Sequence, residues 1–317
     1  MKILWLATDR SNRVADIFGP LQRCVADIVD VDFIYRHIEI LPKAWQQRYT
    51  TGSMKPPRLV IPKRANEYDF IMVDAPFAFL DEAWDKIKTP KGVLIEDQHG
   101  DVLRYIKKYA NLGFDVFFTR YNNILDNHKN LEGQTIKWLP HSVDPEIFDD
   151  YKGFKKHGCL MVGRLQEKVY PLRWKIHQQL VGSNISYFKV DRPEEYTDKH
   201  TRWPVKREYA SLINSSRITF CCMSIFKYPV LKFFEIPACN SVLFSDYNKE
   251  LKQLGFEPNE NMVRIDKVDN IKKFIRGYLR VPDKLKEISQ NGYDLIHTRH
   301  TAQKRAEGFV EYLEDLK

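Results

Sequence analysis

The sequence predicts an α/β protein with two doubly wound domains. Short apolar segments that suit strands alternate with amphipathic segments that suit helices, first within residues 1–150 and again within residues 151–296. This alternation is typical of parallel sheets that are covered by helices. The chain of 317 residues is also longer than one hydrophobic core usually supports, and it suits two domains of roughly 150 residues each.

The first half alternates expected strands with expected helices. The strands are expected at 2–7, 31–35, 69–73, 92–96, 115–119 and 136–139, and the helices at 14–29, 81–87 and 102–109. Ligands of such sheets bind beyond the carboxyl ends of the strands. No G-x-G-x-x-G pattern follows the first strand, where the sequence is ATDRSNRVADIFGP, so a tightly held dinucleotide is not expected in this half.

The second half repeats the pattern after a polar linker at 149–156. Its strands are expected at 158–162, 185–190, 218–223, 241–245 and 262–265, and its helices at 170–180, 205–215, 269–279, 283–296 and 301–316. A further short helix is expected within 228–238, at the start of the stretch YPVLKFFEIPACNSVLFSD. This stretch organises the predicted site.

The short helix carries Lys232 and Glu235, which lie three positions apart and therefore share a face. The first turn of a helix offers N–H groups to a phosphate, to which Lys232 adds a positive charge, while Glu235 can accept from a sugar diol. Pro237 is expected to bend the end of the helix. Asn240 is expected in a left-handed turn, which asparagine tolerates better than most residues. The stretch therefore predicts a nucleotide-sugar site.

Three motifs in order carry a resemblance to a known family. They are Y-A-S-L-I-N-S-S-R-I-T-F, then K-x-x-E-I-x-A-C-x-x-V-L-x-S-D, then H-T-R-H-T-A-Q-K-R near the end. With them, residues 160–309 resemble the second domain of GT-B glycosyltransferases, and most closely family 4 and its spore-maturation-protein-like branch. The first half is similar only in its strand order and in the segment LPHSVDPEIF at 139–148.

The resemblance implies two Rossmann-like domains that face a central cleft. Residues 1–150 would be the acceptor-side domain and residues 151–296 the donor domain, and residues 297–317 would form a helix that crosses back to the first domain. It also implies metal-independent transfer of a sugar, with retention of anomeric configuration. The co-substrate would be a nucleoside diphosphate sugar, with UDP as the expected nucleotide, and no further cofactor is expected.

Donor-binding residues are expected after the first strand of the second half. Gly163 lets the backbone approach a diphosphate, and Arg164 can bind its oxygens through a bidentate fork. Lys168 and Arg173 follow shortly after. The resemblance implies that Arg164 and Lys168 hold the diphosphate.

Two further donor positions come from the resemblance. Glu235 matches the glutamate that binds the ribose hydroxyls. Lys227 stands where the family has another glutamate, which reads the sugar ring. A lysine there favours a phosphate or an anionic sugar.

Asp97 and His99 are the expected catalytic residues. They follow an apolar strand of the first half, where catalytic groups of α/β sheets collect. In the family a histidine near this point touches the donor sugar, and His99 matches it best. The alternative is that Asp97 and His99 form a capping pair for the next helix.

A long non-periodic stretch at 36–68 is the expected acceptor-binding arm. It interleaves Trp45 and Tyr49 with basic residues, of which four are assigned to acceptor binding: Lys55, Arg58, Lys63 and Arg64. This mixture suits an anionic acceptor that contains planar rings, such as a hydroxylated nucleobase in DNA. The alternatives are a surface polymer as acceptor, or a solvated arm or oligomer contact without any acceptor role.

Composition sets the remaining expectations. The formal net charge of +8 favours anionic partners, and the five scattered cysteines lack metal-ligand spacing, which favours a reducing, cytoplasmic compartment. No apolar run approaches the length of a membrane span. Asp30-Val31-Asp32 imitates a metal-binding D-x-D motif, but it opens an apolar strand and is not expected to bind metal.

The sequence leaves one alternative function open. A GT-B-shaped module without catalytic activity could use the basic arm to hold nucleic acid or an anionic polymer. Lys227 in place of glutamate, and Asn240 in place of the glycine that usually follows the central helix, favour this alternative.

Overall fold

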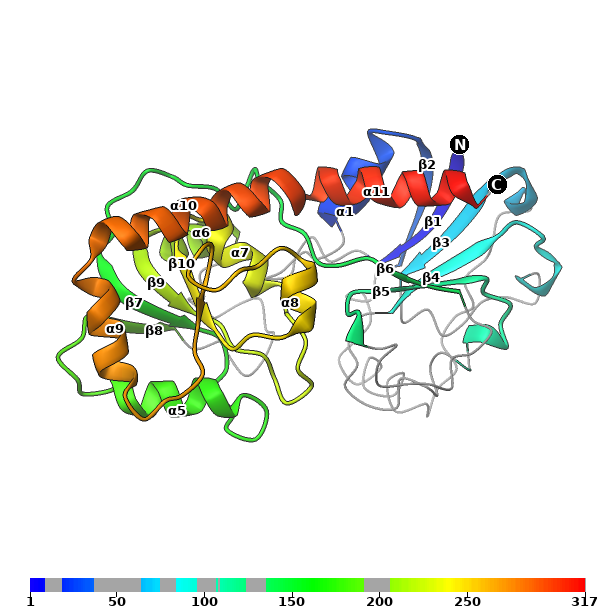
Figure 1. Ribbon diagram of the computed structural model, residues 1–317. Coiled ribbons are helices and arrows are strands. Elements are labelled where there is room, and N and C mark those ends of the chain that lie inside the picture. Colours follow the sequence, from blue (N-terminus) through cyan, green and yellow to red (C-terminus); the bar gives the residue numbers. More distant parts are fainter. Residues whose placement is uncertain are drawn as a thin grey trace. The chain divides into compact units, whose positions relative to one another are not determined.

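The computed structural model describes residues 1–8, 19–36, 64–74, 84–95, 107, 109–123, 135–190 and 206–316. Its residues form two compact units (Figure 1). The first unit reaches to Pro140 and takes up the chain again from Ala306, while His141–Arg305 form the second. The predicted class is confirmed, because each unit is built on a parallel sheet with helices between its strands.

The first unit contains a parallel sheet of six strands in the order β2-β1-β3-β4-β5-β6. The strands are β1 (Lys2–Thr8), β2 (Asp30–Arg36), β3 (Phe70–Asp74), β4 (Lys91–Ile95), β5 (Val116–Thr119) and β6 (Thr135–Trp138). All described residues of β3, β4 and β5 are buried, as expected for strands covered on both faces. The sequence pattern placed all six within a few residues.

The expected helices of the first unit are described only in part. The helix expected at 14–29 is described as α1 (Gly19–Ala26), and the one expected at 81–87 is described only as the 3₁₀ turn η3 (Trp84–Lys86). A second 3₁₀ turn, η2 (Ala65–Glu67), precedes β3. The helix expected at 102–109 falls almost wholly outside the described residues.

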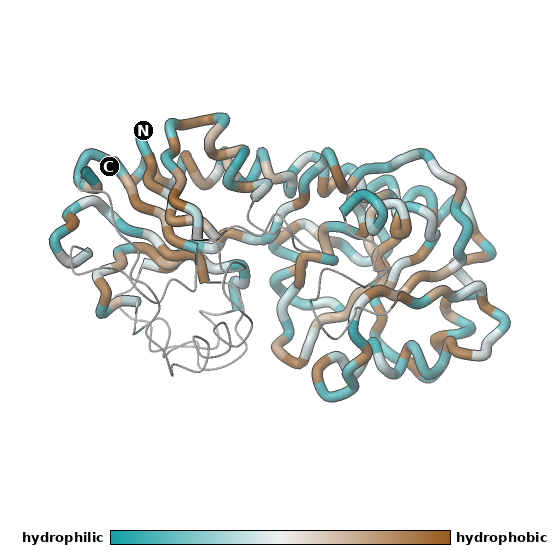
Figure 2. Tube along the Cα trace, turned by 180° about the vertical axis from the view of Figure 1, so that it is seen from behind, coloured by the Kyte–Doolittle hydropathy of each residue, from teal (hydrophilic) through white to brown (hydrophobic). Residues whose placement is uncertain are grey.

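The final helix, α11 (Ala302–Asp315), contributes to the core of the first unit. Phe309 packs its ring 5.7 Å from that of Trp5 in β1 and 5.1 Å from that of Phe118 in β5. The opposite face of the sheet is covered by a second apolar cluster that includes Trp84 and Phe117. Figure 2 shows apolar residues concentrated along the strands.

The second unit contains a parallel sheet of five strands in the order β11-β10-β9-β7-β8. The strands are β7 (His157–Val162), β8 (Tyr187–Val190), β9 (Ser216–Phe220), β10 (Val242–Ser245) and β11 (Val263–Arg264). The helices are α5 (Pro171–Leu180), α6 (Lys206–Asn214), α7 (Lys232–Ala238), α8 (Lys249–Gln253), α9 (Ile271–Leu279) and α10 (Pro282–Arg299). In Figure 1, α5 and α9 lie on one face of this sheet, and α6, α7 and α10 lie on the other.

Helix α7 is anchored at its carboxyl end by side chains from three different segments. The carbonyl of Ala238 lies 3.2 Å from His297 Nε2, that of Cys239 accepts from Asn214 Nδ2 at 2.9 Å, and that of Asn240 accepts from Lys155 Nζ at 2.6 Å. The last carbonyls of a helix need such donors when they are buried. The position of α7 is therefore fixed by long-range contacts.

The segment 149–156, which the sequence suggested as a linker, lies within the second unit and makes specific hydrogen bonds there. Asp150 accepts hydrogen bonds from Asn214 Nδ2 at 3.0 Å and from Asn240 Nδ2 at 2.8 Å. Burial raises the pKa of Asp150, but the hydrogen bonds from Lys152, Asn240 and Asn214 outweigh burial and hold it well below its usual range. Asn240 has φ = +52°, so the left-handed turn predicted after α7 is confirmed.

Candidate functional site

Three neighbouring strands of the second sheet end side by side and bring candidate residues together. β7 lies beside β9, which lies beside β10, and all three run parallel. Gly163 directly follows β7, Cys221 follows β9 and Asp246 follows β10. The carboxyl edge of a parallel sheet is where ligands of open α/β folds bind.

Gly163 lies at this edge, directly after β7. Its φ is +101°, a backbone conformation that side-chain-bearing residues rarely adopt. A Cβ atom placed on it would lie 3.2 Å from Arg173 Nη1 and 3.5 Å from Lys232 Cε. The structure thus gathers Arg173 from α5 and Lys232 from α7 around a position that has no side chain.

Arg173 is buried and ties the ends of two strands together. It is only 3% exposed, and its Nη1 donates to the carbonyl of Arg164 at 3.1 Å while its Nη2 donates to the carbonyl of Cys222 at 3.3 Å. The guanidinium also lies 4.1 Å from the ring centre of Tyr170. Arg173 therefore supplies a buried positive charge at the edge and positions the backbone of Arg164.

Glu235 lies one turn along α7 from Lys232 and is 4% exposed. Tyr209 of α6 donates its hydroxyl to Glu235 Oε2 over 3.4 Å. Burial and the charge of Glu235 raise the pKa of Tyr209 well above its usual value, so the phenol stays protonated as the donor. The buried tyrosine holds the carboxylate in place.

The expectation that the first turn of α7 offers its N–H groups to an anion is wrong for three residues. The N–H groups of Phe233, Phe234 and Glu235 already donate to the carbonyls of Val230 and Leu231. Leu231 itself has helical backbone angles, so the turn begins upstream of the helix proper. At this end of the site, Lys232 contributes a positive charge.

Lys227 lies near an acidic residue, Asp246, that was not predicted from the sequence. Its Nζ lies 3.9 Å from Asp246 Oδ2, and its φ of +57° is unusual for lysine. Asp246 is in turn fixed through its Oδ1, which accepts from the N–H of Met223 at 2.9 Å and from Ser245 Oγ at 3.0 Å. Asp246 ends the S-D motif after β10, which is the signal that could have found it.

Arg164 and Lys168 lie on the loop that follows Gly163. Arg164 is partly exposed and Lys168 is exposed. The loop is tied to the loop after β9, because the N–H of Ile225 donates to the carbonyl of Val169 at 2.9 Å. Within the described part of the chain, no hydrogen bond or ion pair is formed by Lys168.

The candidates of the first half are mostly outside the described residues. This holds for Asp97 and His99, and for Lys55, Arg58 and Lys63. Arg64 is described: it is exposed, and its Nε lies 3.7 Å from Glu67 Oε1. Arg64 is therefore the one predicted acceptor residue that the structure describes, and its described ion pair is with Glu67.

Asp32 of the D-x-D imitation contacts two protein side chains. Asp32 lies in β2, accepts from Tyr68 Oη at 2.6 Å and lies 3.2 Å from Lys2 Nζ. The hydrogen bonds from Tyr68 and Lys2 lower the pKa of Asp32. Among the residues that the structure describes, no group of three potential metal ligands occurs and no helix is both long and apolar enough to cross a membrane.

Comparisons with known proteins agree with this geometry. Residues 161–311 match the family model of glycosyl transferase-like proteins. A search of curated proteins found no match. The chain resembles the Anabaena protein Alr3699/HepE, solved in complex with UDP-glucose, with 13% identity and a TM-score of 0.61 over 99% of this chain and 100% of that one.

Other solved structures share the architecture. Sucrose-phosphate synthase from Thermosynechococcus elongatus has 10% identity and a TM-score of 0.61 over 100% of this chain and 99% of that one. TarM has 13% identity and a TM-score of 0.56, and the match covers 77% of this chain but only 54% of TarM. The fold is therefore that of the GT-B glycosyltransferases, and the second half is glycosyltransferase-like in sequence as well.

Proposed function

We propose that this protein is a glycosyltransferase that moves a sugar from a nucleoside diphosphate sugar, with UDP as the nucleotide, to an acceptor. The observation that carries the proposal is the placement of Arg173 and Lys232 around Gly163, at the carboxyl edge of a GT-B donor-type sheet. The Anabaena protein of the same fold was solved in complex with UDP-glucose, which supports the choice of nucleotide.

The proposed chemistry follows from the charges at this edge. When the bond between sugar and diphosphate breaks, negative charge develops on the leaving group, and cations fixed beforehand stabilise it. Lys232 and Arg164 would contact the diphosphate, and Lys168 would join them from the same loop. Arg173 would contribute its buried positive charge and would hold the backbone of Arg164 in position. Side-chain cations would do this work without a metal.

Glu235 would accept hydrogen bonds from the ribose hydroxyls. Tyr209 donates to one carboxylate oxygen over 3.4 Å, and an ionised carboxylate has lone pairs for several donors at once. Lys227 would face the transferred group and favour an anionic sugar, with its charge moderated by Asp246. We further propose retention of anomeric configuration, with the leaving phosphate as base, as in the family that the sequence resembles.

The acceptor proposal comes from sequence alone. The basic arm at 36–68 favours an anionic acceptor with planar rings, such as a hydroxylated base in DNA, over a surface polymer. Asp97 and His99 would act on the sugar or orient the acceptor. We also propose, from the order of motifs in the second half, that the chain is nearest the spore-maturation-protein-like branch.

Replacement of Glu235 tests the donor site. We expect Glu235→Ala to weaken UDP binding by about 1–3 kcal/mol, because charged hydrogen bonds to the ribose are lost. Isothermal titration calorimetry measures the change. Glu250, which is also 4% exposed but lies on α8, is the matched control, and Glu250→Ala should leave the affinity unchanged. Unchanged affinity in Glu235→Ala for UDP, GDP and dTDP alike would show that the site is misplaced.

Replacement of His99 tests whether this residue acts in catalysis and not in nucleotide binding. We expect His99→Ala to lower the rate of donor hydrolysis or transfer while UDP affinity stays nearly constant, because the residue is proposed to act on the sugar. The assay incubates the protein with UDP-, GDP- and dTDP-sugars and follows release of the nucleotide. Equal loss of rate and affinity would assign His99 a structural role. If the unaltered protein turns over no donor and binds polymer tightly, the non-catalytic binding module replaces the present proposal.

A further inference from the structure

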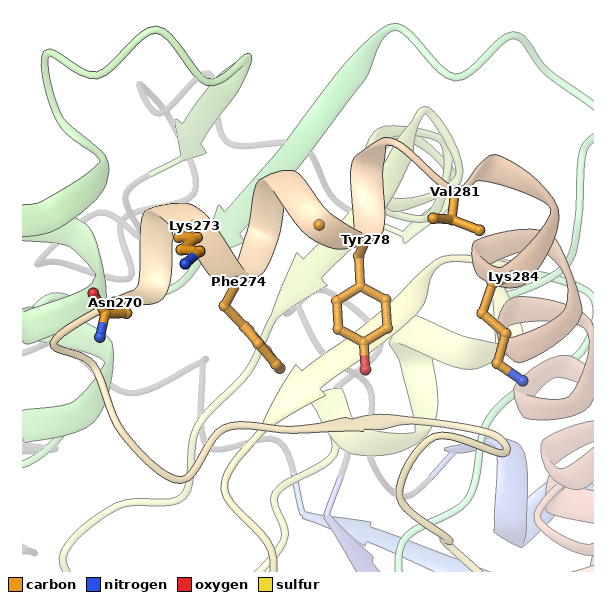
Figure 3. Close-up of a pocket in the computed structure, with 7 residues that line it drawn as sticks. Asn270, Lys273, Phe274, Tyr278, Val281 and Lys284 are labelled. Atoms are coloured by element: carbon orange, nitrogen blue, oxygen red, sulfur yellow. The ribbon is translucent and has the colours of Figure 1, made fainter.

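An open pocket of about 650 Å³ lies along α9 and the start of α10, and it shares no residue with the donor site (Figure 3). Both helices belong to the second unit. The pocket is lined by Phe274, Tyr278 and Val281, by the backbone of Gly277, and by polar side chains that include Lys273 and Lys284. A volume of this size suits a small ligand or one chain of a larger amphiphile.

The wall of the pocket is a cluster of aromatic rings. Phe274 and Tyr278 lie with their ring centres 5.2 Å apart, and both pack on the buried Phe244 of β10, at 6.0 and 5.2 Å. Tyr278 already donates its hydroxyl to Asn259 Oδ1 at 2.6 Å, and burial raises its pKa, so it remains a neutral ring. The wall offers apolar contact and few directional hydrogen bonds.

Apolar side chains also remain exposed at this surface. Val281 is 52% exposed and Phe274 is 37% exposed. Both residues belong to the part of the chain that runs from the middle of α9 to the start of α10. Because both side chains line the pocket, its apolar wall is accessible to a ligand.

Among the described residues, two lysines and no acidic residue line the pocket, and the segment of the chain that forms it is rich in basic residues. Residues 264–287 contain eight lysines and arginines against four aspartates and glutamates, a surplus of +4 out of the formal +8 of the whole chain. In Figure 3, Lys273 and Lys284 lie on either side of Phe274 and Tyr278. Lys284 is paired with Glu287 at 3.1 Å, whereas Lys273 forms no ion pair among the described residues.

We propose that this pocket binds an anionic lipid of a membrane surface, with an acyl chain along Phe274, Tyr278 and Val281 and the phosphate at Lys273. A sugar needs several directed hydrogen bonds, which the ring wall does not supply, whereas an amphiphile needs an apolar wall and a cation. Exposed apolar side chains beside a basic helix give peripheral binding to anionic bilayers. The proposal is independent of the donor site.

Vesicle sedimentation tests the proposal on the full-length protein. We expect binding to vesicles of phosphatidylcholine with phosphatidylglycerol, weakening with salt, and no binding to phosphatidylcholine alone. Lys273→Glu should lower the affinity about tenfold or more, because each charge near an anionic surface contributes about fivefold and the reversal changes two. Val281→Ser should lower it severalfold through lost apolar contact.

The control is Lys252→Glu, the same charge change at an exposed position on α8, which lies apart from α9 in Figure 1. It should bind vesicles like the parent. UDP affinity should be unchanged in all three variants, so failure here is distinguishable from failure of the donor site. The proposal is overturned if vesicles of both compositions bind alike or not at all, or if Lys252→Glu weakens binding as much as Lys273→Glu. It is also overturned if the two pocket variants lose binding to single-stranded DNA while keeping their affinity for vesicles.

Discussion

Gly163→Ala is expected to lower UDP affinity roughly tenfold to a hundredfold, the cost of about one charge-assisted hydrogen bond. The new Cβ would lie 3.2 Å from Arg173 Nη1 and 3.5 Å from Lys232 Cε, in the space where the proposed diphosphate approaches the backbone. Alanine also has to adopt φ = +101°, which adds strain of about 1–3 kcal/mol to the folded state. Calorimetry with UDP and urea unfolding measure the two effects separately.

Gly182→Ala provides the matched control. Gly182 also has a positive φ, +69°, but an added Cβ would meet nothing within 4 Å. This variant should therefore lose stability through backbone strain and keep its UDP affinity. If both variants lose affinity equally, the effect at Gly163 comes from general destabilisation, and the edge of β7 is not the phosphate site.

The sheets were predictable from the sequence because their strands are buried runs. The β3 residues FIMVD and the β10 residues VLFS are wholly buried, and each stands between polar or turn-forming segments. The strands could therefore be predicted from local runs of apolar residues. Helix limits were less predictable: a helix was expected within 228–238, whereas α7 covers Lys232–Ala238, and α8 (Lys249–Gln253) was not expected. Helix ends depend on capping contacts that a periodic pattern does not encode.

The candidate site was predictable only where its residues lie close in sequence. Lys232 and Glu235 come from one short motif, and Gly163 from the end of one strand. Tyr209 and Asp246 were missed because their roles depend on contacts to Glu235, 26 residues from Tyr209, and to the N–H of Met223, 23 residues from Asp246. Arg173 was chosen for its charge, but its hydrogen bonds to two backbone carbonyls became visible only in the fold.

The motif H-T-R-H-T-A-Q-K-R contains a histidine that the fold keeps neutral. His300 is 5% exposed, and its ring stacks on Phe256 and meets Phe234 edge to face. Its Nε2 lies 2.8 Å from the carbonyl of Leu254, to which it must donate, and Nδ1 lies 3.0 Å from Arg305 Nη2, from which it must accept. Both hydrogen bonds are therefore formed only by the neutral ring that carries its single proton on Nε2.

A second proton on His300 would break the bond from Arg305 and place two cations together in the core. Burial, and then the charge of Arg305, lower the pKa of His300 from 6.5 to about 4. Because the folded pKa lies below the unfolded one, the contribution of His300 to stability is complete above pH 6.5 and is lost as the pH falls toward 4. The loss amounts to about 2 kcal/mol at pH 5 and about 3 kcal/mol at pH 4.

Comparison with His300→Gln isolates this effect from all other acid-titrating groups. Glutamine can donate to Leu254 and accept from Arg305, but it does not titrate. We expect the free energy of unfolding of the parent, measured in urea by circular dichroism, to fall between pH 7.5 and pH 5 by about 2 kcal/mol more than that of the variant. Parallel pH profiles would show that His300 titrates alike in the folded and unfolded chains. In that case the paired bonds to Leu254 and Arg305 would not be what keeps the ring neutral.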